Sequence, residues 1–178
     1  MTPSQPLKPL MPADTVLWFS DLMAKHHIPF VVDGGWGVDA LLGKQTRPHD
    51  DLDIAVSEAD APAIRALLET AGYREVPRGD SWECNFVMGD DLGHQIDLHS
   101  CTFDAQHQLV HGVAYPYESL QGSGKIAGRP VRCIPSEWMV QFHTGYPLDE
   151  NDYHDVRLLC ERFGIQLPAE YDRFVTNK

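Results

Sequence analysis

Basic side chains are scarce in this sequence. Its 178 residues include 14 Lys and Arg against 26 Asp and Glu, which gives a formal net charge of −12 at pH 7. A protein whose main partner is nucleic acid usually needs a basic face, so we expect no nucleic acid partner. The negative charge instead suits a cationic small ligand or a bound divalent metal ion.

Long hydrophobic runs are also missing. No apolar stretch approaches the roughly 18 residues that a membrane helix needs, so we expect no membrane partner. The first 12 residues hold four prolines and one lysine, without the basic start and apolar middle of a signal peptide. We therefore interpret residues 1–12 as a short disordered leader and expect a cytoplasmic protein.

Paired cysteines with metal-binding spacing are absent. The four cysteines are scattered and form no Cys-x-x-Cys pattern; they are Cys84, Cys101, Cys133 and Cys160. A zinc site of the usual kind is therefore not expected, and reduced thiols fit a cytoplasmic protein.

Hydrophobic periodicity predicts both helices and strands in one globular unit. Helical spacing of apolar residues is found over residues 12–27, 36–42, 58–71, 136–143 and 151–163, with a last short helix from Pro168. Short apolar segments that predict strands lie at residues 30–32, 51–56, 73–76, 82–88, 94–101, 110–115 and 131–133.

Two further patterns are interpreted as surface. Residues 122–125 read Gly-Ser-Gly-Lys, which lacks the spacing of a phosphate-binding loop and predicts a surface turn. Four histidines show no spacing that suggests a metal pair on a helix, and a hairpin surface is the expected location of His94, His99, His107 and His111.

Carboxylates are concentrated on one predicted strand. Asp51 and Asp53 alternate with Leu52 and Ile54, so both acids project from one face, roughly 6.5–7 Å apart, while the apolar residues point into the core. Two like charges at this distance disfavour each other's ionisation. A divalent ion between them removes this cost, and a few oxygen ligands suit Mg²⁺.

A third acid fits the same site if its strand lies beside the first. Asp97 is flanked by apolar residues on a predicted strand. With Asp51 and Asp53 it would hold one or two metal ions, two Mg²⁺ being the expected number. Alternatively, Asp97 takes a proton from an attacking hydroxyl group as the catalytic base. Edge-strand aspartates that face water are the other interpretation of this pattern.

A double glycine precedes these acids. Gly34 and Gly35 lack a Cβ atom, so a ligand can approach the backbone closely, and successive N–H groups at a helix start attract anions. Arg47 and His49 lie just before the acids and are predicted to bind phosphate oxygens. The four residues together predict a nucleotide-binding site.

These residues carry a family resemblance. The matching motifs are Gly34-Gly35-Trp36, Arg47-x-His49-Asp50-Asp51-x-Asp53 and the later Asp97. Over about residues 30–164 the chain resembles the small antibiotic nucleotidyltransferases of the DNA polymerase β-like superfamily. The resemblance implies an α+β fold, with a mixed β-sheet flanked by helices and a C-terminal helical part.

The resemblance also implies an activity and its parts. Such enzymes move a nucleoside monophosphate from a nucleoside triphosphate, here ATP or another NTP, to a drug hydroxyl group and release pyrophosphate. Asp51 and Asp53 would hold Mg²⁺, with Asp97 as third ligand, general base or both. The superfamily usually has Gly-Ser where this chain has Gly34-Gly35, so backbone N–H groups and Arg47 would have to hold the phosphates without a serine hydroxyl.

Two subgroups of the family compete for the acceptor. Residues 33–39, 142–148 and 152–155 look like the lincosamide nucleotidyltransferases, and residues 46–51 and 127–133 look as much like the aminoglycoside 2″-nucleotidyltransferases. Because the lincosamide-like stretches flank the predicted site, a lincosamide is the expected acceptor and an aminoglycoside the alternative. A toxin–antitoxin-type nucleotidyltransferase acting on a macromolecule is a more distant alternative, as is a catalytically silent binding module.

The acceptor site is predicted from aromatic rings, acids and a histidine near these motifs. Rings would stack on drug carbons and acids would meet the drug's protonated amine; the candidates are Asp33, Trp36, Tyr146, Asp152 and His154. We expect residues 12–104 to form the catalytic domain and residues 105–178 a mainly helical substrate-binding part. A homodimer is left open.

Overall fold

One mixed sheet organises the molecule. A computed structural model describes residues 10–175, and most of the predicted leader at residues 1–12 lies outside this range. Within the described residues eight strands form the sheet, in the order β3-β4-β5-β2-β1-β8-β7, with β6 paired to β5. The strands are β1 Val31–Val32, β2 Leu52–Ser57, β3 Arg74–Val76, β4 Asn85–Gly89, β5 Gln95–Phe103, β6 Leu109–Gly112, β7 Gly122–Ile126 and β8 Arg129–Cys133.

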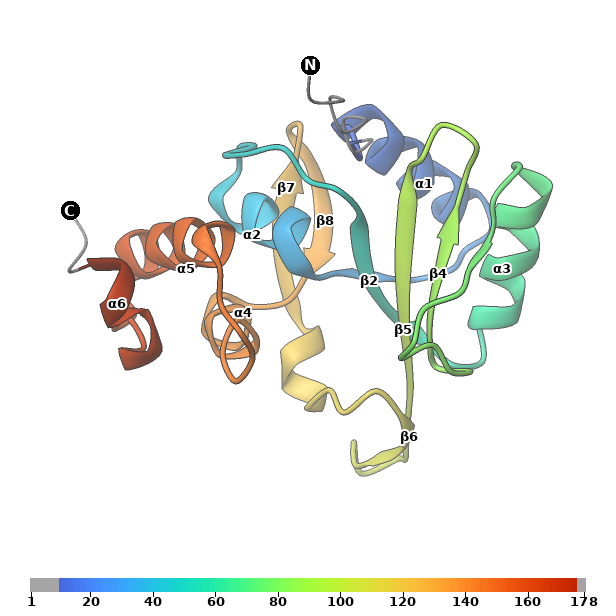
Figure 1. Cartoon of the computed structure of the whole chain (residues 1–178). Coiled ribbons are helices and arrows are strands. Elements are labelled where there is room, and N and C mark those ends of the chain that lie inside the picture. The colour runs from blue at the N-terminus through green and yellow to red at the C-terminus, as the bar shows by residue number, and fades with distance from the viewer. Residues whose placement is uncertain (1–9, 176–178) are drawn as a thin grey trace, which may run out of the picture.

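Helices cover both faces of this sheet (Figure 1). They are α1 Ala13–Lys25, α2 Gly34–Leu42, α3 Ala61–Thr70, α4 Ser136–Phe142, α5 Glu150–Phe163 and α6 Asp172–Val175, with 3₁₀ turns η1 Tyr117–Leu120 and η2 Ala169–Tyr171. One apolar cluster joins α1 and α3 to the sheet, and a second lies among α2, α4, α5 and the other face. The predicted α+β fold with a mixed sheet flanked by helices is therefore confirmed.

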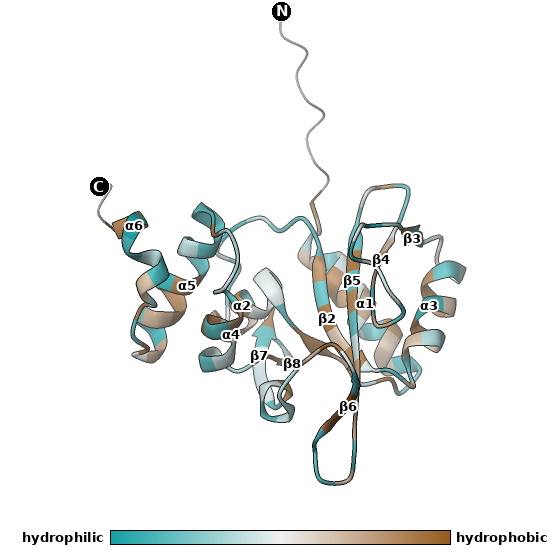
Figure 2. Cartoon of the chain, turned by 60° about the horizontal axis from the view of Figure 1, so that its bottom comes forward, coloured by the Kyte–Doolittle hydropathy of each residue, from teal (hydrophilic) through white to brown (hydrophobic). Residues whose placement is uncertain are grey.

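Strand β5 shows how the sequence pattern positions the site. Its burial alternates, with Ile96 and Leu98 in the core and Asp97 and His99 on the opposite face. Hydrophobic and hydrophilic colours accordingly alternate along this strand in Figure 2. Because β5 pairs with β2 in parallel, the polar face of one strand continues the polar face of the other.

The segment Gly122-Ser123-Gly124-Lys125 corrects one prediction, because it forms part of β7 rather than a surface turn. A Cβ atom on Gly124 would lie 2.4 Å from the carbonyl oxygen of Ala40 in α2. Glycine therefore lets the strand lie directly against the helix, a use that resembles a turn signal in the sequence.

The sheet continues past the expected boundary at residues 104/105. Strands β6, β7 and β8 follow that boundary, and β8 pairs in parallel with β1. The part after residue 105 thus combines strands with α4, α5 and α6, and its division from residues 12–104 stays a functional proposal. None of the helices between residues 10 and 175 has the length and apolar character needed to cross a lipid bilayer.

Candidate active site

Two carboxylates face each other across β2 and β5. These strands run parallel, and their register places Asp53 opposite Asp97. Asp51 lies just before the start of β2 and is close enough to raise the pKa of Asp53. The strand with Asp97 thus lies beside the strand with Asp53, which is the condition that the sequence left open.

The N-terminus of α2 meets these acids. Asp33 caps the helix by accepting a hydrogen bond from the N–H of Gly34 at 2.8 Å, so the helix begins at Gly34 rather than at Trp36 as predicted. Gly34 has a φ of +57°, and a Cβ atom there would lie 2.1 Å from Oδ2 of Asp53. Glycine is therefore required at this position by both the backbone conformation and the close approach of the carboxylate.

A chain of hydrogen bonds joins the helix cap to the second carboxylate. The Tyr115 hydroxyl donates to Oδ2 of Asp33 at 2.7 Å and accepts from Nδ1 of His99 at 2.9 Å. The other ring nitrogen of His99, Nε2, lies 3.4 Å from Oδ1 of Asp97. Because Tyr115 engages Nδ1, it orients the imidazole so that Nε2 faces the carboxylates.

The acids of this site strongly affect the pKa values of neighbouring groups. Burial and the nearby charges of Asp51 and Asp33 raise the pKa of Asp53 to about 8. Burial would lower the pKa of His99, but the adjacent carboxylate of Asp97 and the charges of Asp53 and Asp33 raise it. The site therefore has an excess of negative charge that favours a bound cation.

The residues present fit a divalent metal ion. Ligand atoms of Asp53, Asp97 and His99 lie within 4.8 Å of one another. Oδ1 of Asp97 is buried and makes no hydrogen bond within residues 10–175. Carboxylate oxygens suit Mg²⁺, and an imidazole nitrogen beside them can bind the metal or orient its ligands.

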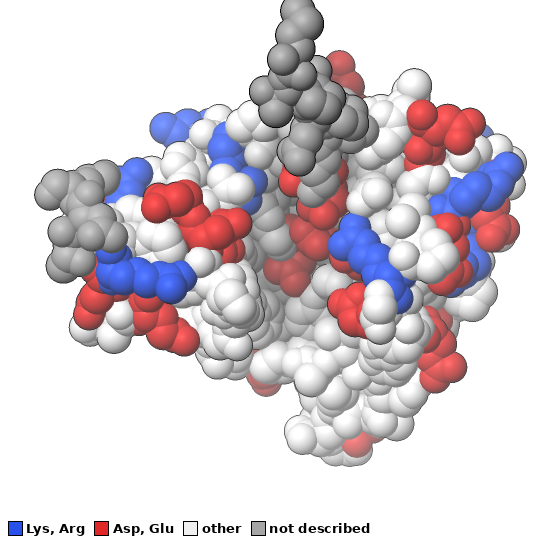
Figure 3. All heavy atoms as spheres, viewed as in Figure 1, with Lys and Arg blue, Asp and Glu red and all other residues white. Residues whose placement is uncertain are grey.

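Acidic side chains gather in a hollow of the surface. Figure 3 shows them between the side of the molecule that carries α5 and the side that carries β4 and β5, with basic side chains on both sides of the hollow. Such an arrangement attracts a cation to the bottom of the hollow and leaves basic groups for anionic parts of a ligand.

His49 lies beside Gly35, but its ring is buried. Its Nε2 lies 2.5 Å from Oδ2 of Asp39, and the side chain is only 3% exposed. The ring packs against Trp36 with 4.8 Å between centroids, and a Cβ atom on Gly35 would lie 2.3 Å from Nδ1 of His49. His49 therefore packs against the start of α2. Its ring is buried in this arrangement and does not contact a phosphate group as predicted.

Arg47 also lies beside Gly35 and is held by a buried acid. Its Nε and Nη2 donate to the two carboxylate oxygens of Asp155 at 2.9 and 2.6 Å. Asp155 is fully buried, whereas Arg47 is 21% exposed. This bidentate pair fixes the loop before β2 to α5, and only the exposed part of the guanidinium can reach a phosphate.

The predicted acceptor residues occupy four different environments. Asp33 lies at the carboxylates, whereas Trp36 is 2% exposed and cannot contact an acceptor in this arrangement. Tyr146 donates to Asp152 at 2.8 Å, and Asp152 also accepts from the N–H of Asp149 in the capping box of α5. His154 has a buried Nε2 without a hydrogen-bond partner in the described part of the chain.

His99 and Tyr115 are site residues that sequence reasoning missed. The histidine was interpreted as hairpin surface, and the structure corrects this, because Asp97-x-His99 puts both side chains on one face of β5. That spacing is a signal the sequence contains. Tyr115 offers no comparable signal, since it reaches the site from a segment after β6 through tertiary packing.

Tyr115→Phe is expected to weaken metal binding without unfolding the protein. Loss of the hydroxyl leaves Asp33 and His99 without a shared partner, which typically costs about 1–3 kcal/mol of stability. Mispositioning a group next to a metal site lowers affinity about 10–100-fold. Calorimetric Mg²⁺ titration and thermal unfolding measure both effects. Tyr117→Phe, which removes a hydroxyl outside this chain of bonds, is the control, and an unchanged Mg²⁺ affinity in Tyr115→Phe would contradict the orienting role.

The sequence is similar to proteins of known activity. Residues 15–159 match the family model described as aminoglycoside-2''-adenylyltransferase. A lincosamide resistance protein of Staphylococcus haemolyticus is 29% identical over 154 residues, which cover 81% of this chain and 91% of that protein. A 2''-aminoglycoside nucleotidyltransferase of Escherichia coli is 30% identical over 157 residues, which cover 80% of this chain and 82% of that protein.

Solved structures share the fold. Lincomycin-bound lincosamide antibiotic adenylyltransferase LnuA superposes with a TM-score of 0.74 at 23% identity, covering 88% of this chain and 99% of that chain. ANT(2")-Ia in complex with adenylyl-2"-tobramycin gives a TM-score of 0.70 at 23% identity, covering 92% of this chain and 93% of that chain. The mixed sheet and its helices are thus those of nucleotidyltransferases.

Proposed function

Because this chain belongs to the aminoglycoside-2''-adenylyltransferase family, we propose that it moves a nucleoside monophosphate from ATP or another NTP to a hydroxyl group of a small antibiotic. The single observation that carries the proposal is the register of β2 and β5, which sets Asp53 opposite Asp97 at the N-terminus of α2. The acids that would bind a metal ion therefore lie beside the helix N-terminus that would bind phosphates.

Asp51, Asp53 and Asp97 are the proposed ligands of Mg²⁺, two ions being the expected number. When bound, the metal supplies positive charge that offsets the negative charge of the triphosphate and of the leaving pyrophosphate. The backbone N–H groups at the start of α2 are the proposed contacts of the phosphates. Nη2 of Arg47, which donates to Asp155, lies beside Gly35, so the guanidinium is close to this helix N-terminus.

Asp97 is the proposed general base. The acceptor hydroxyl oxygen attacks the α-phosphorus, its proton moves to the Asp97 carboxylate, and the bond from that phosphorus to pyrophosphate breaks. His99 lies 3.4 Å from Oδ1 of Asp97 and is oriented by Tyr115. These two residues position the base and are not required to contact the acceptor.

A lincosamide is the proposed acceptor, and an aminoglycoside is the second candidate. The lincosamide resistance protein is matched over 91% of its length, whereas the 2''-aminoglycoside nucleotidyltransferase is matched over 82% at nearly the same identity. Residues 33–39 include the cap of α2 and so lie at the site itself. The net charge of −12 suits the protonated amines of either drug class.

Both parts of the chain contribute to the proposed site. Residues 12–104 supply the acids and the glycines, whereas Tyr115 and Asp155 come from residues 105–178. The second part would also carry the acceptor pocket, with Tyr146, Asp152 and His154 as candidates, and a homodimer stays a proposal. We place the protein in the cytoplasm, where ATP is available.

Incubation of the purified protein with Mg²⁺, ATP and single drugs tests this function. Mass spectrometry is expected to detect one added nucleotide unit on lincosamides, or on aminoglycosides if the second candidate is correct. Asp97→Asn protein, assayed alongside, is expected to give no product above background because the proton acceptor is lost. The proposed function fails if no drug of either class gains mass.

A further inference from the structure

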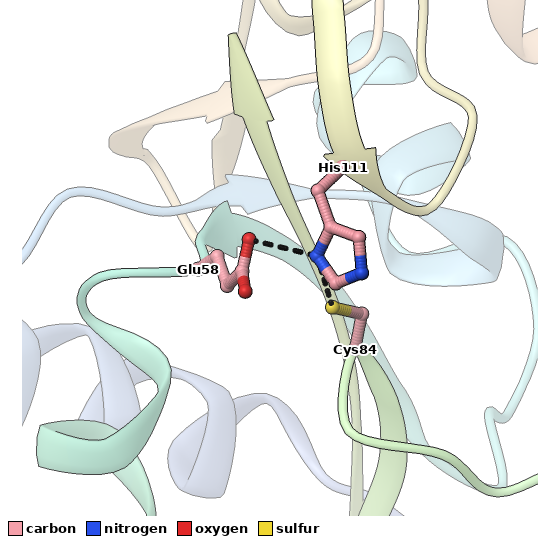
Figure 4. Close-up of side chains that lie close together, drawn as sticks. All are labelled: Glu58, Cys84 and His111. Atoms are coloured by element: carbon pink, nitrogen blue, oxygen red, sulfur yellow. Dashed lines mark hydrogen bonds and ion pairs between the residues drawn. The ribbon is translucent and has the colours of Figure 1, made fainter.

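Three side chains converge at the end of the sheet opposite the carboxylates. Glu58 follows β2, Cys84 precedes β4 and His111 lies in β6, so three separate segments supply them (Figure 4). Asp53 and Glu58 are separated by five positions, which corresponds to roughly 16 Å along an extended strand. The cluster is therefore separate from the proposed active site.

The spacing of the three groups is that of a metal site. Nδ1 of His111 lies 3.1 Å from Oε2 of Glu58 and 3.7 Å from Sγ of Cys84. Ligand atoms of all three lie within 4.8 Å of one another. Around a tetrahedral Zn²⁺, nitrogen–oxygen and nitrogen–sulfur separations are about 3.3 and 3.6 Å, which follows from the usual bond lengths. A small ion can thus bind with little side-chain movement.

The side chains of Glu58 and Cys84 lie on the same side of the His111 ring. A metal ion bound through one ring nitrogen of a histidine needs its other ligands on the side of that nitrogen. Here both Glu58 and Cys84 approach Nδ1 of His111, as Figure 4 shows. A metal ion in place of the shared hydrogen satisfies all three groups at once.

Neighbouring residues hold the candidate ligands in place. The Thr102 hydroxyl donates to Oε2 of Glu58 at 2.7 Å, and the hydrogen bonds of Thr102 and His111 hold the pKa of Glu58 below its usual value. The ring of Trp82 meets His111 edge-on with 5.9 Å between centroids. Such outer contacts orient metal ligands in known sites.

The cluster is open to solvent on one side. Glu58 is 37% and His111 45% exposed, whereas Cys84 is fully buried beneath them. Oε1 of Glu83 lies 3.4 Å from the other ring nitrogen of His111, and Glu58 and Glu83 both line a surface hollow. An ion can therefore enter from solvent and still reach the buried sulfur of Cys84.

We propose that Glu58, Cys84 and His111 bind a thiophilic divalent ion, preferably Zn²⁺, with a water molecule in the fourth position. Oxygen, sulfur and nitrogen donors together select such a metal over Mg²⁺. The ion ties β6, which otherwise pairs only with β5 in the described sheet, to the ends of β2 and β4. The sequence lacks Cys-x-x-Cys because distant segments assemble this site.

Cobalt titration of the full-length protein tests the site. The protein is freed of metal with a chelator and reduced, and Co²⁺ is added in the presence of excess Mg²⁺, which competes for the oxygen-rich carboxylates. We expect one equivalent of Co²⁺ to produce the near-ultraviolet charge-transfer band of a cobalt–thiolate bond. Added Zn²⁺ should displace Co²⁺ and remove the band.

Variants test which residues bind the Co²⁺ ion that gives the charge-transfer band. Cys84→Ser is expected to abolish it, whereas Cys160→Ser, which removes a buried thiol in α5, should keep it. Thr102→Val should weaken Co²⁺ binding about 10–100-fold, and His111→Asn at least as much. Circular dichroism of the metal-free variants checks that each is folded, and the exposed position of His111 makes its substitution the safer one.

One further variant separates the cluster from the active site. Persistence of the band in Asp53→Asn is expected, because the carboxylate site is separate. The proposal is overturned if Co²⁺ gives no thiolate band, if the band survives in Cys84→Ser, or if His111→Asn binds Co²⁺ with unchanged affinity. A band that disappears in Asp53→Asn would likewise overturn it by assigning the metal to the active site.

Discussion

Asp53→Asn is expected to make the metal-free protein more stable at about pH 8 while strongly lowering its activity and removing its response to Mg²⁺. In the folded protein, burial and the charges of Asp51 and Asp33 raise the pKa of Asp53 to about 8. An aspartate in the unfolded chain has a pKa of about 3.9. Asparagine keeps the shape of the side chain and removes this charge.

The sign of the pH dependence follows from these two values. Between about pH 4 and pH 8 the folded state binds more protons at Asp53 than the unfolded state does. Its contribution to the free energy of unfolding therefore falls as pH rises through this window. The melting temperature in EDTA should be higher for Asp53→Asn than for the wild type at about pH 8, and the difference should vanish toward pH 4.

In the presence of Mg²⁺ the wild type is expected to be more stable than Asp53→Asn. A ligand that binds only the folded state stabilises it, by about 2.7 kcal/mol at 100 times its Kd, and this gain should be confined to the wild type. Loss of an electrostatic stabiliser of this kind lowers kcat by about 10²–10³-fold. Thermal unfolding with and without Mg²⁺ measures the stability, and the drug nucleotidylation assay measures kcat.

Asp91→Asn is the matched control for this prediction. Asp91 is an exposed acid in the turn between β4 and β5, so the same change of charge is made away from the site. Its melting temperature and Mg²⁺ response should follow the wild type. A Mg²⁺ response retained in full by Asp53→Asn would contradict the proposed metal site.

Asp155→Leu is expected to cause the largest loss of stability among the proposed variants. Asp155 is fully buried and makes both hydrogen bonds with Arg47. Removal of one partner leaves the guanidinium largely buried and unpaired, which costs about 3–5 kcal/mol for a buried pair. Because Arg47 is 21% exposed, we expect the lower end, roughly 3 kcal/mol, and a melting temperature lower by roughly 6–12 °C.

A double-mutant cycle isolates the pair. Arg47→Met combined with Asp155→Leu should recover part of the stability lost in either single variant, since no unpaired charge is left inside. Asp21→Ala breaks the exposed pair of Asp21 with Arg129 and should hardly change the melting temperature. Single-variant losses that simply add in the double variant would refute the coupling.

The same cycle tests the phosphate contact predicted for Arg47. If Arg47 only anchors the loop, Arg47→Met and Asp155→Leu should lower activity equally at a temperature where both are folded. If its exposed edge also binds phosphate, Arg47→Met should raise the KM for ATP further than Asp155→Leu does. Urea unfolding establishes the folded range for each variant before the kinetic measurements.

Much of the site could be predicted from the local spacing of residues in the sequence. Alternation on a strand predicted that Leu52 and Ile54 are buried and that Asp53 points to the opposite face, because side chains of a strand point to opposite sides in turn. Asp51, predicted on the same face as Asp53, lies just before β2. The glycine pair was also readable, although the helix begins at Gly34 itself with Asp33 as its cap. These features depend on neighbours within a few residues.

Partners distant in the chain were beyond such reasoning. His49 and Arg47 were predicted to bind phosphate from their position before the acids, yet Asp39 and Asp155 engage them. A cation with no visible partner in its own segment looks available for a ligand. The acid that pairs with Arg47 lies 108 positions away, so local patterns could not identify it.

The sequence by itself determined the chemical groups, the alternation of β2 and β5 and the presence of a glycine pair between a strand and a helix. Only the tertiary structure decided that Asp97 lies opposite Asp53, because strand register is fixed by long-range pairing and core packing. It also decided that Tyr115 orients His99 and that Glu58, Cys84 and His111 meet. Side chains from distant segments come together only when the apolar faces of the sheet and helices are buried.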